Sequence, residues 1–146
     1  MIKQREIKFR AWDKKENLML YPEKHTRDKS GSFFLSVTDW SLCVMQFTGL
    51  LDKNGKDVYE DDLVRNKSNT DVNGKKYYSV YKVCFGFCGI DTCEGSWSSN
   101  GWYLETLGLN RGGVFEKWGR EQTGTKEIEQ MEVISNIYEM EGVIKN

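Results

Sequence analysis

Hydrophobic and polar residues alternate along several short segments of this 146-residue chain, the pattern of β-strands with one buried face. In residues 7–12 every second residue from the first onward is apolar or small. This predicts a strand whose other face, with Arg10 and Trp12, meets water. A polar turn at residues 13–17 and the apolar run at residues 18–21 complete a predicted hairpin.

The middle of the chain predicts a longer hairpin. Asn73 and Gly74 form a strong turn signal, because both residues accept the backbone dihedrals of a tight reversal. The segment after it, residues 77–87, is the most β-prone of the chain and is expected to lie centrally in a sheet. Beyond it we expect a Gly- and Ser-rich loop at residues 86–101, a strand at 102–107, and a loop at 108–124 with an extended piece near 114–118.

The remaining segments are shorter. Residues 132–139 fit a closing strand with a kink at Asn136, and residues 128–131 fit either a helical turn or the lead-in to that strand. The other expected elements are a surface loop at residues 22–31, a strand at 33–37, a turn at 38–41 and a short helix at 140–144.

The stretch from Gln46 to Val64 is the most informative part of the chain. Its Asp52-Lys-Asn-Gly55 segment predicts a turn in which the Asp side chain accepts hydrogen bonds from nearby backbone N–H groups. Apolar arms flank this turn. The three adjacent carboxylates of residues 60–62 then predict a bend whose acidic side chains all point into solvent, because like charges repel.

Residues 46–64 resemble the central motif of the YopX family of phage and prophage proteins, in which Thr-Gly-Leu precedes an Asp-x-Asn-Gly turn and Ile-Tyr-Glu-Gly-Asp-Ile-Val. Residues 5–13 and 132–139 are similar to the other two motifs of that family, in the same order. The resemblance implies a phage or prophage setting and no particular activity. Asp61 and Ser135 stand where the family usually has Gly. Asp is among the residues that tolerate a left-handed backbone, so Asp61 is expected to keep that conformation.

Composition supports a mostly β, single-domain protein. The chain has one Ala and 14 Gly, which disfavours long helices, and 146 residues are one domain's worth. We expect a strongly bent antiparallel small barrel of SH3-like type, with extra hairpins and one short C-terminal helix; an α+β fold is the alternative. The N-terminal and C-terminal motifs are expected to close onto the same sheet.

Charge excludes a general attraction to nucleic acid or to anionic membranes, because the net charge is -1. The charge is uneven, however: residues 1–30 have nine Lys and Arg against five Asp and Glu, and residues 31–64 have two against six. We interpret this as two opposed solvated faces. The charged N-terminus and the lack of a long apolar run predict a cytoplasmic protein of a bacterial host, with reduced cysteines and no membrane partner.

Three groups of residues have side chains that could carry chemistry. The spacing of the cysteines provides no Cys-x-x-Cys knuckle, so buried structural thiols are favoured over a zinc site. His25 has no motif that would make it catalytic. The acidic bend is better explained by solvation than by magnesium binding. No cofactor and no metal are expected. The cysteines concerned are Cys43, Cys84, Cys88 and Cys93.

These patterns favour a non-enzymatic accessory protein that binds a protein partner or itself through exposed sheet edges. One alternative is a single-stranded nucleic-acid binder that uses aromatic residues and the basic N-terminal segment. The other is a metal-dependent enzyme that uses the acidic bend. The candidate binding surface consists of Trp12, Asp13, Glu60, Asp62, Trp97 and Trp102.

Overall fold

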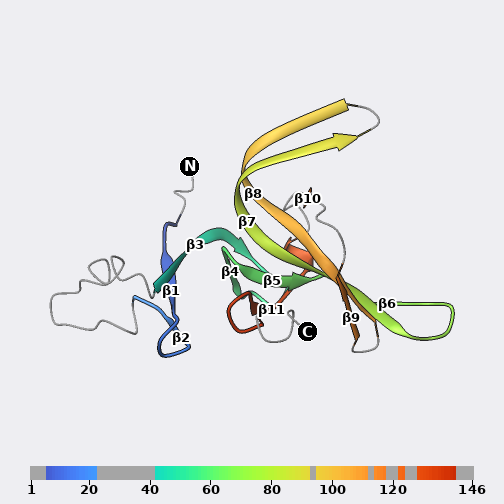
Figure 1. Ribbon diagram of the computed structural model, residues 1–146, viewed down its shortest axis with the longest axis horizontal. Coiled ribbons are helices and arrows are strands. Elements are labelled where there is room, and N and C mark those ends of the chain that lie inside the picture. The colour runs from blue at the N-terminus through green and yellow to red at the C-terminus, as the bar shows by residue number, and fades with distance from the viewer. Residues whose placement is uncertain are drawn as a thin grey trace.

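The part of the protein that the structure describes is built mainly of antiparallel strands, as the sequence predicts (Figure 1). The computed structural model describes residues 6–22, 42–92, 95–111, 114–117, 122–123 and 128–140, and of residues 87–92, 95–100, 114–117 and 122–123 only the backbone. These residues form eleven strands and one turn of 3₁₀ helix, and the sheet curls into a half-barrel. The mostly β prediction is therefore confirmed.

The first sheet has four strands in the order β2-β1-β3-β4. Strand β1 (Phe9–Asp13) pairs with β2 (Leu18–Leu20) as the predicted hairpin and with β3 (Leu42–Leu51) on its other side. Strand β4 (Asp57–Tyr59) returns along β3 after the predicted turn.

The second sheet has seven strands, and its main path runs β10-β8-β7-β5-β11. Strands β7 and β8 form its centre, and the closing strand β11 pairs with β5. The short strands β6 and β9 pair with β7 and β8 respectively. The bounds are β5 Asp62–Arg65, β6 Asn69–Thr70, β7 Lys76–Thr92, β8 Gly95–Arg111, β9 Val114–Lys117, β10 Gln122–Thr123 and β11 Glu132–Asn136.

Three apolar clusters form the core of the described residues, and the two larger ones hold the two sheets. The larger contains Val64, Val83, Leu104 and Val133 of the second sheet together with Ile128 of the 3₁₀ helix Ile128–Gln130, so the undecided segment before β11 is a helical turn. The smaller consists of Trp12, Met45, Phe47 and Tyr59, against which Tyr138 packs. Burial of these side chains supplies the main driving force for the fold.

The Thr-Gly pair of the central motif forms an irregularity in β3. The pairing of β3 with β4 shifts register between Phe47 and Leu51, and Gly49 in that interval has a φ of 85°. The hydroxyl of Thr48 donates to the carbonyl oxygen of Val58 (2.7 Å) and accepts from the N–H of Leu50 (3.1 Å). A β-bulge at a left-handed Gly therefore bends the strand.

Residues 86–101 do not form the predicted loop. Strands β7 and β8 remain paired up to Thr92 and Gly95, so this segment is the far half of one long hairpin. Gly86 and Gly101 lie opposite each other, with φ values of 140° and 147°, and Figure 1 shows the hairpin bending away from the body of the protein. The glycines that suggested a loop instead allow a bend within a continuous ribbon.

The prediction that the N-terminal and C-terminal motifs share a sheet is wrong. Strand β1 lies in the four-stranded sheet and β11 in the seven-stranded sheet. They meet through side chains instead: the rings of Trp12 and Tyr138 are stacked, with centroids 6.0 Å apart and planes 11° apart. The prediction that Arg10 and Trp12 face water is also wrong, because both are buried.

Several predictions concern residues outside the described part of the chain. These are most of the loop at 22–31, the strand at 33–37, the turn at 38–41, His25, and residues 141–144 of the expected C-terminal helix. The extended piece near 114–118 is confirmed by β9. The predicted closing strand at 132–139 is confirmed only up to Asn136, where β11 ends, and residues 137–139 form a turn. The SH3-like connectivity stays a prediction.

Candidate binding surfaces

The acidic bend does not present three carboxylates to solvent. Asp62 is fully buried, and its carboxylate pairs with the guanidinium of Arg10, which corrects the prediction that all three residues of the bend are solvated. Asp62 also accepts a hydrogen bond from the N–H of Tyr59 (2.8 Å), and the Arg10 guanidinium lies 4.4 Å from the centre of the Tyr59 ring. Asp62 therefore joins the two sheets through β1.

Asp61 occupies a left-handed backbone position, with a φ of 65°, as expected from the Gly usual at that place in the family. Its carboxylate accepts a hydrogen bond from the hydroxyl of Tyr138 (3.0 Å) and lies 3.9 Å from the ammonium group of Lys82. Burial and the charge of Asp61 raise the pKa of Tyr138, so its phenol stays protonated.

Glu60 is the remaining carboxylate of the bend. Its side chain is half-buried, and its carboxylate is hydrogen-bonded to the backbone of Gln46. Burial and the adjacent charge of Asp61 raise its pKa above the ordinary value of 4.5. The three carboxylates thus have three separate environments.

Trp12 and Asp13, also predicted for a binding surface, are both buried. Trp12 packs against Tyr138, as described above. The Asp13 carboxylate accepts hydrogen bonds from the backbone N–H groups of Lys15 (2.9 Å) and Glu16 (3.2 Å), which holds the β1–β2 turn. Because these contacts build the fold, we assign both residues to its framework and not to a surface.

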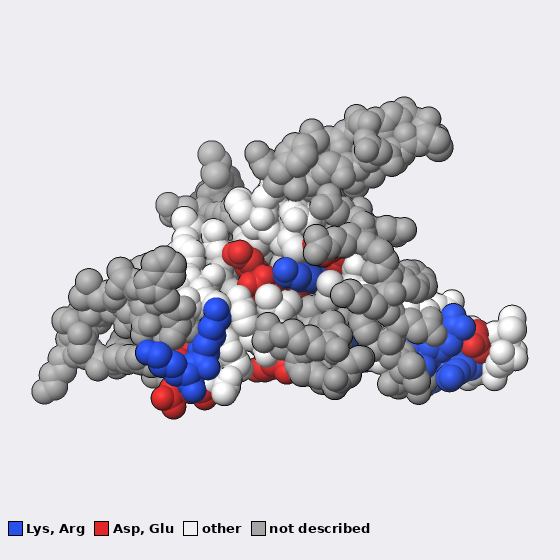
Figure 2. Space-filling view, in the orientation of Figure 1, with Lys and Arg blue, Asp and Glu red and all other residues white. Residues whose placement is uncertain are grey.

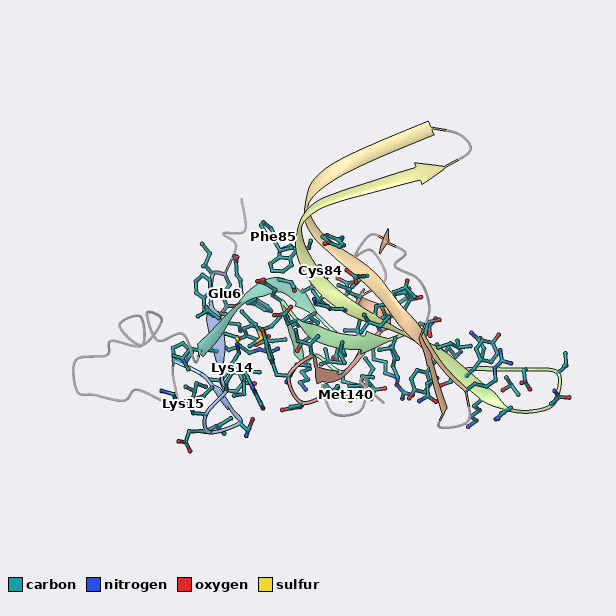
Figure 3. The ribbon with its side chains drawn as sticks, viewed as in Figure 1. Glu6, Lys14, Lys15, Cys84, Phe85 and Met140 are labelled. Atoms are coloured by element: carbon teal, nitrogen blue, oxygen red, sulfur yellow. The ribbon has the colours of Figure 1, made fainter. Side chains whose placement is uncertain are left out.

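Trp102 and Phe85 face each other across β7 and β8 at the base of the long ribbon. Their ring centroids are 4.8 Å apart in an edge-to-face arrangement, and Phe85 is 56% exposed. Figure 3 shows Phe85 and Cys84 where the ribbon leaves the body. Burial raises the pKa of the Cys84 thiol to about 11, so this thiol is protonated at neutral pH and is a poor nucleophile.

The far half of the ribbon is a candidate surface that sequence reasoning missed. Within the described chain, β7 from Cys84 to Thr92 and β8 from Gly95 to Tyr103 pair only with each other. Trp97, the last of the predicted surface residues, lies here with its backbone opposite Ile90. The many Gly and Ser residues of this segment indicated a loop, so its two strands were not predicted.

A second surface lies at the opposite end of the same hairpin, around β6. Figure 2 shows Lys and Arg side chains gathered there. A pocket of about 180 Å³ lies beside this end of the hairpin. Sequence reasoning assigned the turn but not the surface, because the cations are spread over segments that pairing brings together. The pocket is lined by Asn66, Lys67, Asn69, Gln130 and Met131.

The fold defines a β-protein whose curled sheet bears a projecting two-stranded ribbon and a basic end, and the described residues contain no group of three or more His, Cys, Asp or Glu that could hold a metal ion. A sequence model of the YopX protein family matches residues 8–145, and the chain belongs to that family. This confirms the resemblance of the three motifs.

Among solved structures, the chain is similar to the crystal structure of protein EF1440 from Enterococcus faecalis. The two are 17% identical in sequence, the match covers 97% of this chain and 99% of that chain, and the TM-score is 0.51. At this identity the likeness concerns the fold alone. No curated protein matches the chain. No helix in the part of the chain that the structure describes is long and apolar enough to cross a membrane.

Proposed function

We propose that this YopX family member is a non-enzymatic phage or prophage accessory protein, acting in the bacterial cytoplasm, that binds a protein partner or a second copy of itself by strand pairing. The observation that supports the proposal is the projecting half of the β7–β8 ribbon. Its outer edges have no neighbouring strand among the described residues, so their backbone N–H and C=O groups can pair with an added strand.

The composition of the ribbon supports the same proposal. Edge strands that avoid pairing usually have Lys or Pro, whereas residues 87–92 and 95–100 contain neither and have a single charged residue, Asp91. They also contain Phe87, Ile90 and Trp97. An isolated two-stranded ribbon is only marginally stable in water, so pairing with another chain would also stabilise it.

The metal-dependent alternative gains no support from the bend. Asp62 is engaged with Arg10, and Asp61 with Tyr138, so the carboxylates do not converge on a common point.

The nucleic-acid alternative gains no support from the basic N-terminal segment, which was the surface first considered for it. Lys8 forms ion pairs with Glu6 (3.5 Å) and Asp57 (2.7 Å) and Arg10 is buried, so these cations of the N-terminal segment are neutralised.

A shortened ribbon tests the proposal. Because Gly86 and Gly101 lie opposite each other, replacing residues 87–100 with Asn-Gly closes the hairpin with a two-residue turn. The mass of the full chain in solution, measured by light scattering over a range of concentrations, is expected to exceed that of a monomer if the partner is a second copy. The shortened variant should then be monomeric with an unchanged far-ultraviolet circular dichroism melt.

The same pair of proteins distinguishes the other partner. If the full chain is monomeric, the full-length and shortened proteins should be used side by side to capture proteins from a phage-infected host. A protein retained by the full chain and lost by the folded, shortened variant supports a separate protein partner. If the full chain is monomeric and both forms capture the same proteins or none, the ribbon is not the binding element and the proposal fails.

A further inference from the structure

We infer that the basic end around β6 is a binding site for single-stranded nucleic acid. This site lies away from the projecting half of the ribbon and goes beyond the strand pairing proposed above, on which it does not depend. It combines three features that such sites require: unneutralised cations, aromatic rings with stacked guanidinium groups, and a pocket of suitable polarity.

The cations come from segments that the sheet brings together. Residues 65–77 contain four Lys or Arg and one carboxylate, Asp71, and the neighbouring end of β8 adds Arg111. Lys67, Lys75 and Lys76 are exposed, and none of the three forms an ion pair with a described residue. Their charge is therefore free to attract phosphates, although the net charge of the chain is -1.

Two tyrosines at this end are each covered by an arginine. The guanidinium of Arg111 lies 5.8 Å from the centre of the Tyr77 ring, and that of Arg65 lies 4.8 Å from the centre of the Tyr78 ring. Arg111 is exposed, so the outer plane of its guanidinium is open to a stacked base. The Nε and Nη2 groups of Arg65 donate hydrogen bonds to Oε2 of Glu132 (2.8 Å and 2.6 Å). Arg65 is therefore held in place and belongs to the framework of the site.

The pocket supplies groups that match the edge of a base. Three of its five lining residues are amides: Asn69 and Gln130 each have a donor and an acceptor, whereas the Oδ1 of Asn66 already accepts from the N–H of Ser79 (2.9 Å). Met131 is a buried apolar residue at the wall of the pocket. Asn69 lies directly opposite Tyr77 across β6 and β7, which connects the pocket to the arginine-covered tyrosine. Lys67, also in the lining, is placed for an adjacent phosphate.

These features favour an unpaired strand over a duplex or a lipid surface. A base can enter the pocket or stack on Arg111 only when it is free of its own partner. A membrane would require an apolar patch, and between residues 65 and 77 the exposed large apolar residue is Val72 alone among the residues described.

The test is binding of a fluorescein-labelled oligothymidylate to the full chain at low salt, measured by fluorescence anisotropy. Lys67→Gln/Lys75→Gln/Lys76→Gln should weaken binding at least about tenfold, because each lysine neutralises a phosphate, and should make the salt dependence shallower. The control variant Lys14→Gln/Lys15→Gln/Lys56→Gln removes the same charge from exposed positions elsewhere and should bind within about twofold of the wild type.

Three outcomes would overturn the inference. The wild type could fail to bind the oligonucleotide at low salt, or both triple variants could lose affinity equally, which would show a general effect of charge. Stronger binding to phosphatidylserine vesicles than to oligothymidylate would assign the site to a lipid surface instead.

The variant Asn69→Ala/Gln130→Ala tests the pocket. It should weaken binding and reduce any preference between oligonucleotides of different base, while the melting temperature stays within a few degrees of the wild type.

Discussion

Asp52 joins its own turn to the closing strand of the protein: its Oδ2 accepts a hydrogen bond from the backbone N–H of Val133 (3.0 Å), 81 residues further along the chain. Its Oδ1 accepts from the N–H groups of Asn54 (2.8 Å) and Lys56 (2.9 Å). Burial raises the pKa of Asp52, but these N–H groups more than offset it, so the pKa lies below its ordinary value.

The chain contains a natural control for this residue. Asp71 begins a second Asp-x-Asn-Gly-Lys turn in which its Oδ1 accepts from the N–H groups of Asn73 and Lys75 (both 2.9 Å), as at Asp52. Gly55 and Gly74 have φ values of 77° and 76°, so the two turns have the same form. Among the residues that the structure describes, only the first turn is hydrogen-bonded to a distant strand.

We therefore predict that Asp52→Asn destabilises the protein and Asp71→Asn does not. An Asn can keep the Oδ1 bonds of either turn, but at position 52 its NH₂ group would face the Val133 N–H, leaving a buried donor unsatisfied. The expected losses in the free energy of unfolding are about 1–3 kcal/mol for Asp52→Asn and below about 0.5 kcal/mol for Asp71→Asn. Urea unfolding of both variants measures them, and equal losses would contradict the prediction.

The same pair of variants has a predicted pH dependence. Because the pKa of Asp52 is lowered on folding, its stabilisation is present above the unfolded value near 3.8 and is lost as pH falls through the folded value. The difference in stability between wild type and Asp52→Asn should therefore narrow in acid. A difference that widens below pH 4 would show that the folded pKa is not lowered.

The buried pair of Arg10 and Asp62 gives the next prediction. Asp62→Ala should cost about 3–5 kcal/mol of unfolding free energy, because it leaves the Arg10 charge buried without a partner. Burial raises the pKa of Asp62 while Arg10 lowers it, and the Nε of Arg10 is buried with no acceptor among the described residues. Desolvation therefore offsets much of the attraction between the pair.

Replacing both partners should consequently be less harmful than replacing one. Arg10→Met/Asp62→Leu is expected to be more stable than Asp62→Ala, although the Tyr59 N–H loses its acceptor. Glu132→Ala, which breaks the part-exposed pair with Arg65, is the control and should cost much less stability than Asp62→Ala, because solvent screens this pair. A double variant less stable than Asp62→Ala would contradict this account.

Local structure could be predicted from the sequence where a residue type has a strong preference for one backbone conformation. The Asp-x-Asn-Gly turns follow from backbone preferences and are confirmed, and the left-handed conformation of Asp61 agrees with the Gly usual at that place in the family. Burial of Asp62 and Trp12 was not predictable, because it depends on partners far along the chain, Arg10 and Tyr138. Alternation could not show that both faces of β1 are covered.

The β7–β8 hairpin shows the same limit in another form. Val80 and Val83, three residues apart in β7 and so on opposite faces of the strand, are both buried, and the pairing with β8 shifts register between Val80 and Tyr81. A bulge of this kind leaves no mark in a single sequence. The basic end escaped prediction because Arg111 and Lys76 become neighbours only when the strands pair.

Glu60 gives a prediction in which the contribution to stability changes with pH in the opposite direction to that of Asp52. Its pKa is raised on folding by burial and by Asp61, so the stability that it contributes is fully present below its unfolded value of 4.5 and is lost as pH rises through the folded value. Glu60→Gln should therefore raise the melting temperature at pH 7 and leave it unchanged near pH 4. The exposed Glu129→Gln is the control, and its effect should not vary in this way. A lower melting temperature for Glu60→Gln at pH 7 would contradict the prediction.

Asp61 allows the backbone and side-chain effects at the family's usual Gly position to be separated. Asp61→Gly removes the cost of a left-handed residue, about 1 kcal/mol, but it also removes the acceptor of the Tyr138 hydroxyl. In the wild-type background the two effects oppose each other, so the free energy of unfolding should change by less than about 1 kcal/mol. In a Tyr138→Phe background the hydrogen bond is already absent, so Asp61→Gly should be stabilising there.

The control is Asp61→Ala, which loses the carboxylate and keeps the strained left-handed backbone. It should be less stable than Asp61→Gly in both backgrounds. If Gly and Ala were equally stable at this position, its left-handed conformation would have no energetic consequence, and the family's usual Gly would need another cause.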